Sequence, residues 1–190
     1  MEAADIGILG IAGILLAAAA ASAAVLSGCR RRQKLLSILR SETLGLSREV
    51  AELAEAICSR QADGRIIDQD VLDRYSLTEP QTYPGLIPSL WRLPTDLAGR
   101  AVEFHGQLCL ARSRLAAWRR GERGSISTYL LVSALTRSAN SGDGILREST
   151  RRLGWPTGWK PEMPLASALV EGIERTNPEL LDGGYWSPPA

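Results

Sequence analysis

The sequence LSILRSETLGLSREVAELAEAI, residues 36–57, decides the fold. Within it, mostly apolar residues recur at alternating spacings of three and four: Leu36, Leu39, Thr43, Leu46, Val50, Leu53 and Ile57. A helix brings positions with this spacing onto one side, so the stretch predicts a long helix with a heptad seam that needs a partner.

A second stretch, LAGRAVEFHGQLCLARSRLAAW at residues 97–118, has the same spacing and the same length. Its seam consists of Leu97, Ala101, Phe104, Leu108, Ala111, Leu115 and Trp118. The connection between the two stretches contains several prolines, which exclude a long helix there. Two seams of equal length joined by a compact connection predict an antiparallel helical hairpin.

The rest of the chain also favours helices. Asp63-Gly64 ends the first helix, and Ser125 can begin a third one. Residues 140–144, Asn-Ser-Gly-Asp-Gly, have poor helix propensity, so they either break this third helix or are carried through it by packing. Pro164 can start a short helix that runs to about Arg175. A single phenylalanine and few β-branched residues do not favour strands.

The N-terminal residues predict the localisation of the protein. Ile6–Leu26 is uncharged and about 20 residues long, the length that a helix needs to cross a bilayer. Acidic residues precede it, and Arg30, Arg31, Arg32 and Lys34 follow it at what would be the membrane interface. Because basic residues stay on the cytoplasmic side, the flanks predict a single-pass inner-membrane protein with its N-terminus outside and its body cytoplasmic. The scarcity of lysine, found only at Lys34 and Lys160, is typical of a high-GC bacterial genome.

Two other interpretations of this segment stay open. It can be a cleaved secretory signal with Ala21-Ser22-Ala23 as the cleavage site, although its acidic start argues against a signal peptide. Alternatively, Leu26-Ser27-Gly28-Cys29 resembles a bacterial lipobox, which makes Cys29 the lipidation candidate of the chain.

Small residues at Gly13, Ala17 and Ala21 lie four apart, a spacing that lets two membrane helices approach closely. The partners predicted are therefore the lipid bilayer and either a second copy of the chain or another protein. In sum, the expected fold class is all-α, with an N-terminal transmembrane helix followed by a helical hairpin or small helical bundle. The expected domains are the anchor (1–28), the helical domain (29–153), and a loop with a short helix and a frayed tail (154–190).

One motif carries a resemblance. The segment YPGLIPSLWRLP at 83–94, followed by LAGRAVEFH at 97–105, resembles a pattern in uncharacterised bacterial single-span membrane-anchored helical proteins. His105 stands where these proteins commonly have an aromatic residue, and the resemblance implies architecture but no activity.

No motif predicts chemistry. His105 is the only histidine, and its nearest acid in sequence, Glu103, lies about 200° away around a helix. One histidine and three scattered cysteines do not form a metal motif, and an odd number of cysteines argues against a disulfide framework. The net charge of +1 gives no reason to expect nucleic-acid binding. We therefore expect no catalytic, cofactor-binding or metal-binding residue, and no small-molecule substrate.

The function expected from the sequence is a membrane-anchored helical scaffold or interaction protein without catalytic activity. A bacterial envelope lipoprotein or phage-type lysis accessory, with its body outside the cytoplasm, is the alternative. A third hypothesis, an enzyme, would gain support if His105 and an acid lined a shared cleft.

Overall fold

The computed structural model describes the backbone of residues 3–64, 73–121, 125–155 and 159–176, and the side chains of these residues except 3–24 and 125–127. Within them every secondary-structure element is helical, which confirms the all-α class. The elements are α1 (Ala3–Ala62), α3 (Tyr83–Leu86), the 3-10 helix η1 (Ile87–Arg92), α4 (Thr95–Arg119), α5 (Ser125–Leu153) and α6 (Pro164–Thr176).

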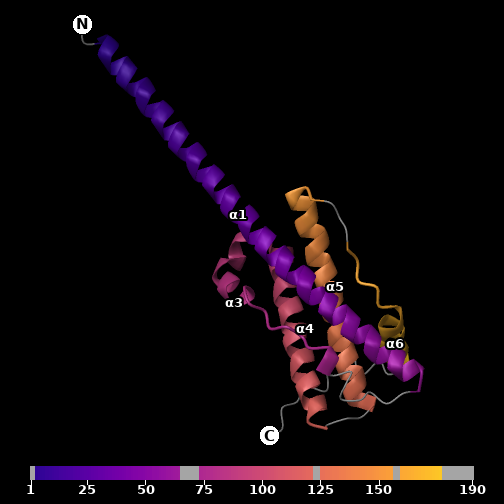
Figure 1. Cartoon of the computed structure of the whole chain (residues 1–190). Coiled ribbons are helices and arrows are strands. Elements are labelled where there is room, and N and C mark those ends of the chain that lie inside the picture. Colours follow the sequence, from indigo (N-terminus) through magenta and orange to yellow (C-terminus); the bar gives the residue numbers. More distant parts are fainter. Residues whose placement is uncertain (1–2, 65–72, 122–124, 156–158, 177–190) are drawn as a thin grey trace.

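Helix α1 is continuous over 60 residues, about 90 Å at 1.5 Å per residue. Its first half extends beyond the other helices, and its second half crosses them (Figure 1). The helix ends where the sequence predicted, because Gly64 adopts a φ of +65°, a conformation that favours glycine.

The predicted localisation is corrected. Among the helices that the structure describes, none is long and apolar enough to cross a membrane. In the described part of α1, after the predicted span, charged residues recur from Arg30 onward, and the apolar residues form one stripe that the bundle buries. A spanning helix needs an apolar surface on all sides. The transmembrane helix and the single-pass inner-membrane localisation are therefore not supported.

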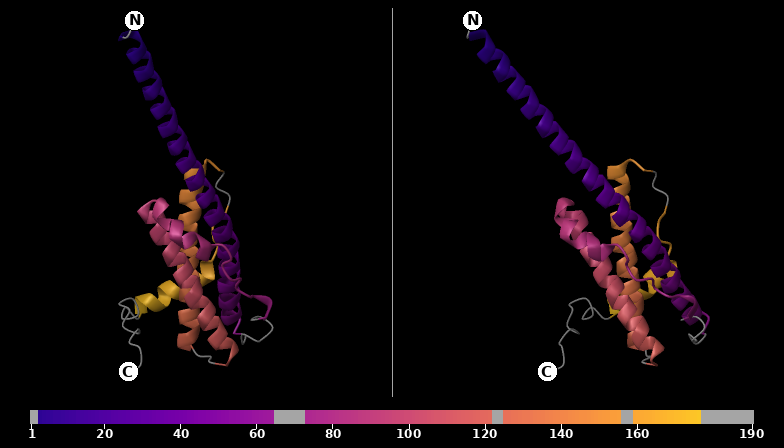
Figure 2. Two further views of the ribbon diagram at one scale, coloured as in Figure 1. Left: turned by 90° about the vertical axis from the view of Figure 1, so that its left-hand side faces the viewer. Right: turned by 60° about the vertical axis from the view of Figure 1, so that its left-hand side comes forward.

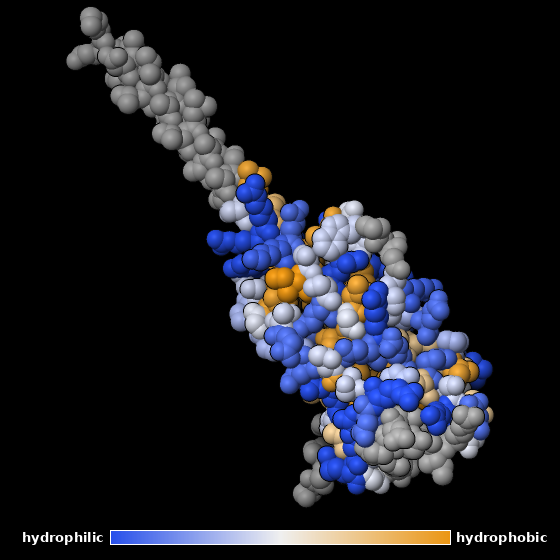
Figure 3. All heavy atoms as spheres, viewed as in Figure 1, coloured by the Kyte–Doolittle hydropathy of each residue, from blue (hydrophilic) through white to orange (hydrophobic). Residues whose placement is uncertain are grey.

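The other predictions for the N-terminal segment are mostly outside the described side chains. Gly13, Ala17 and Ala21, and nearly all of the predicted span Ile6–Leu26, fall in residues 3–24, whose side chains are not described. Arg30, Arg31, Arg32 and Lys34 are described, and all four are exposed. Figure 3 shows a hydrophilic zone at the point where α1 leaves the bundle.

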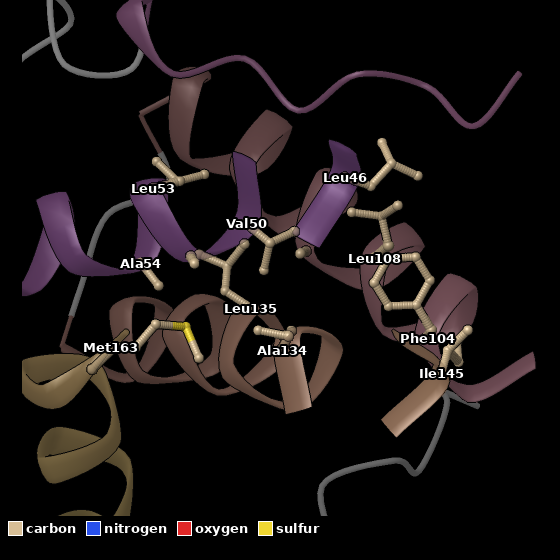
Figure 4. Packing of buried hydrophobic residues seen from close by; sticks show 14 of the residues in the cluster. Leu46, Val50, Leu53, Ala54, Phe104, Leu108, Ala134, Leu135, Ile145 and Met163 are labelled. Atoms are coloured by element: carbon tan, nitrogen blue, oxygen red, sulfur yellow. The ribbon is translucent and has the colours of Figure 1, made fainter. Parts of the chain in front are cut away.

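Both heptad seams are buried, as their spacing predicts. The exposed fraction is at most 5 % at all fourteen positions, and Phe104, Leu39, Leu53 and Ile57 are among the largest fully buried side chains. The two seams belong to one continuous hydrophobic core (Figure 4).

The predicted pairing of the two seams is wrong. Helices α1 and α4 do not form a hairpin with each other, because α5 packs extensively against both of them. Arg40 of α1 donates to Thr150 near the end of α5 (3.2 Å), and Ser138 of α5 donates to the Phe104 carbonyl of α4 (3.4 Å). In Figures 1 and 2, α5 runs antiparallel to α1 and to α4, so that α1 and α4 run in the same direction.

The connection between α1 and α4 explains this direction. Its residues 75–94, which we call the strap, run back along α1. The Glu49 carboxylate accepts the backbone N–H of Thr78 (2.7 Å) and its hydroxyl (2.9 Å), and Glu42 accepts the N–H of Thr82 (2.7 Å). Because the strap returns the chain toward the middle of α1 before α4 begins, α4 repeats the direction of α1.

Helix α5 is continuous through residues 140–144, so packing carries this weak stretch through the helix. At Gly142 the helices approach closely: a Cβ there would lie 2.3 Å from Ser47 Oγ of α1 and 3.0 Å from Phe104 Cε2 of α4. A residue without a side chain is therefore required where α1, α4 and α5 meet.

Helix α6 begins at Pro164, as predicted, and packs against α5 and α1. The Glu55 carboxylate accepts the N–H groups of Leu165 (3.3 Å) and Ala166 (3.4 Å) at its first turn. Met163, Ala166 and Val170 join the same core as the longer helices.

Candidate functional site

The strap meets α4 through a pair of stacked rings. Tyr83 at the start of α3 lies on His105 of α4, with ring centroids 3.5 Å apart and an interplanar angle of 16°. Phe104 contacts the same imidazole edge-on, at 4.9 Å. His105 follows the seam residue Phe104 in the sequence and is buried beside it, with 6 % of its surface exposed.

Burial controls the charge of His105. Desolvation lowers the pKa of the imidazole to about 4, although the nearby Glu42 carboxylate acts in the opposite direction. The ring is therefore neutral at pH 7. Neither Nδ1 nor Nε2 has a hydrogen-bond partner among the described residues, and the same holds for the second carboxylate oxygen of Glu42.

A groove of about 400 Å³ runs between the strap and α4. The strap contributes Glu79, Pro80, Tyr83 and Pro84, and α4 contributes Val102, His105, Gly106, Leu108, Cys109 and Arg112. Its walls are mostly apolar, and one ion pair spans it, between Arg112 and Glu79 at 3.4 Å. Because Glu79 is largely exposed, we expect this pair to contribute less than about 1 kcal/mol to stability.

His105 and Glu79 thus line one cleft, which is the arrangement that would favour an enzyme. The state of the imidazole argues against catalysis. A general base works best when its pKa lies near the operating pH, and a pKa of about 4 makes a weak base. Both ring nitrogens are also shielded from solvent. Within the described residues, no three His, Cys, Asp or Glu side chains come together in a way that could hold a metal ion.

A second feature lies on η1, next in the chain to the groove residues. Trp91 is 76 % exposed and Ile87 is 53 % exposed, whereas Leu90 and Leu93 are buried. The Arg92 guanidinium lies 5.1 Å from the centre of the Trp91 ring. The short helix is therefore fixed to the core on one side and presents two large apolar side chains on the other.

The sequence did not single out Tyr83 or Trp91 as functional. Both belong to the proline-rich motif at 83–94, whose prolines exclude a long helix and whose resemblance implies no activity. The exposure of Trp91 next to a buried Leu90 is set by the 3-10 helix that the prolines favour, and spacing alone does not reveal it.

Cys29, the lipidation candidate, is exposed and reduced, and so is Cys109, whereas Cys58 is buried. Burial, with a smaller contribution from Glu55, raises the pKa of the Cys58 thiol to about 11, so this thiol stays protonated and unreactive. The lipidation of Cys29 and the interface role of the basic residues after it stay predictions.

Comparisons with protein-family models, with curated proteins and with solved structures give no match for this chain.

Proposed function

We propose that this chain is a helical scaffold or interaction protein without catalytic activity, and that the exposed face of η1 binds a protein partner. The observation that carries the proposal is Trp91, which is 76 % exposed on a short helix held in place by buried neighbours. Exposed tryptophans on a fixed backbone are frequent centres of protein interfaces, because they bury a large area at little entropic cost.

The surroundings of Trp91 support this role. Ile87 lies four residues earlier on η1 and is also exposed, so that two apolar side chains of this short helix are available to a partner. Pro88 within η1 and Pro94 after it restrict the backbone, which lowers the cost of ordering this surface on binding. Arg92 beside the indole adds a charged group that is typical of interface rims.

The shape of the chain supports a scaffold. The bundle buries α1 only from Leu35 to Cys58, and every described side chain from Val25 to Lys34 is exposed. Residues 3–34 therefore extend roughly 50 Å beyond the bundle as a single helix. The weak basicity of His105 supports the non-catalytic part of the proposal.

The test is site-specific photo-crosslinking in cells. A photoreactive amino acid in place of Trp91 is expected to give a defined set of adducts that the same amino acid at Glu171, an exposed position of α6, does not give. The photoreactive residue at Ile87 is expected to give adducts with the same partner. Adding Trp91→Ala to that variant is expected to remove these adducts, while the midpoint of thermal unfolding stays unchanged. Identical adducts from positions 91 and 171 would refute the proposal.

A further inference from the structure

The outer face of α4 carries a third heptad pattern, which none of the described elements covers. Its members are exposed, uncharged and spaced four, three, four, three, four and three apart: Thr95, Gly99, Val102, Gly106, Cys109, Ser113 and Ala116. We call them the outer stripe. They lie roughly opposite the buried seam of α4, which faces α5. Among the described helices, α5 packs along the buried seam of α4, and none covers the outer stripe.

A groove adjoins the outer stripe. Val102, Gly106 and Cys109 of the stripe line the groove together with His105. His105 is more than nine-tenths buried, and neither ring nitrogen has a hydrogen-bond partner within the part of the chain that the structure describes. Val102 is 57 % exposed, although it borders an apolar wall. An apolar groove beside an uncovered helix face is what a helix interface needs.

The charges on α4 indicate which helix fits. The N-terminal half carries Asp96 and Glu103, and the C-terminal half carries four arginines: Arg112, Arg114, Arg119 and Arg120. Of these, Arg112 is paired with Glu79 of the strap and Arg114 donates to the Leu130 carbonyl of α5. Arg100 is the exception in the first half, but its side chain lies over Gly144 of α5, where a Cβ would meet it at 2.7 Å. A second α4 in antiparallel orientation places acidic halves opposite basic halves, and it also aligns the two helix dipoles favourably.

We propose that two copies of this chain associate through the outer stripes of their α4 helices, antiparallel and around a twofold axis near Gly106. In this register Gly106 faces its own copy, Gly99 faces Ser113 of the second copy, and Val102 faces Cys109 of the second copy. Each exposed Val102 then enters the groove of the other chain beside Cys109. Such an interface is isologous, so it closes at two chains. The interface between the two copies does not include Trp91, so its test is separate from the test of the proposed function.

Disulfide crosslinking of the full chain tests the register. In a Cys29→Ser background the only exposed thiol is Cys109, since Cys58 is buried. In the antiparallel register the two Cys109 residues are separated by about 9 Å along the helix axes, too far for a disulfide. Adding Val102→Cys places a thiol opposite Cys109 of the second copy. Copper phenanthroline is expected to convert this variant, and not its Cys29→Ser parent, into a covalent dimer.

The control adds Glu171→Cys, on an exposed position of α6, to the same Cys29→Ser background and is expected to stay uncrosslinked. A crosslink in the parent through Cys109 alone would indicate parallel helices and overturn the register. A Val102→Cys variant that stays monomeric under the oxidant would overturn the interface.

A charge at the twofold axis tests the association without crosslinks. In the structure a Cβ at Gly106 or at Gly45 of α1 meets no atom within 4 Å, so both sites accept a side chain within one chain. By light scattering, Gly106→Glu is expected to reduce the mass from two chains to one, and Gly45→Glu to leave the dimer intact. Circular dichroism of both variants checks that the helices persist. A dimer that survives Gly106→Glu, for example one formed through α1, would refute the proposal.

Discussion

Replacement of Gly142 by alanine tests the central packing of the bundle. In the middle of an exposed helix, Gly→Ala normally stabilises a protein by up to about 1 kcal/mol, because alanine has the higher helix propensity. At Gly142 the new Cβ would lie 2.3 Å from Ser47 Oγ, and 3.0 Å and 3.2 Å from two ring carbons of Phe104. The Ser47 hydroxyl has no hydrogen-bond partner among the residues that the structure describes, so it can rotate away. Phe104 is fully buried, so a shift of its ring would disturb the neighbouring core side chains.

The magnitude follows from these two opposing effects. Extra volume in a well-packed core costs about 1–3 kcal/mol, which exceeds the gain in helix propensity. We therefore expect Gly142→Ala to lower the free energy of unfolding by about 1–2 kcal/mol. Gly45→Ala, where a Cβ meets nothing within 4 Å, should raise it by about 0.5–1 kcal/mol. Gly144→Ala should resemble Gly45→Ala, because the atoms in its way belong to the long side chain of Arg100.

Urea unfolding of the three variants, followed by circular dichroism, measures these differences. The double variant Ser47→Ala/Gly142→Ala tests the origin of the cost, because removal of the Ser47 hydroxyl should recover part of the loss, as a double-mutant cycle would show. A Gly142→Ala variant as stable as Gly45→Ala would refute the view that α1, α4 and α5 meet at this residue.

Three further predictions concern His105, the strap and the core. The pKa of His105 is lower in the folded state (about 4) than in the unfolded state (6.5), so the unfolded chain binds its proton first as the pH falls. The free energy of unfolding should decrease between about pH 6.5 and pH 4, by an amount on the order of 3 kcal/mol at most. The His105→Phe variant should not show this decrease. If its free energy of unfolding depends on pH as in the unmodified chain, His105 is not the cause. Glu49→Ala should speed hydrogen exchange at Thr78 because its amide loses its acceptor, and slow exchange there would show that Glu49 does not hold the strap. Leu135→Ala, at a fully buried position of α5, should lower the free energy of unfolding by about 2–5 kcal/mol, as measured in urea. Leu165 is 42 % exposed on α6, so Leu165→Ala should lower it much less. Equal losses would contradict the central position of α5.

The sequence by itself determined which residues of the two long helices are buried. A seam at spacings of three and four occupies one side of a helix whatever its partner is, so all fourteen positions could be named in advance. The end of α1 and the start of α6 also follow from local rules, since Gly64 adopts a positive φ and Pro164 suits the first position of a helix.

Only the tertiary structure decided what the seams pack against. The spacing of a seam does not indicate which helix it packs against. The equal lengths of the two seams predicted a hairpin of α1 with α4. Hydrogen bonds from Thr78 and Thr82 to carboxylates of α1 turn the strap back along that helix, so α4 runs parallel to it. Helix α5 has a weak helical sequence around Gly142, but it becomes the common partner of α1 and α4. Because Gly142 has no side chain, both helices can approach α5 closely at this residue. The groove beside His105 and the exposed Trp91 follow from the same strap, through contacts between residues far apart in the chain.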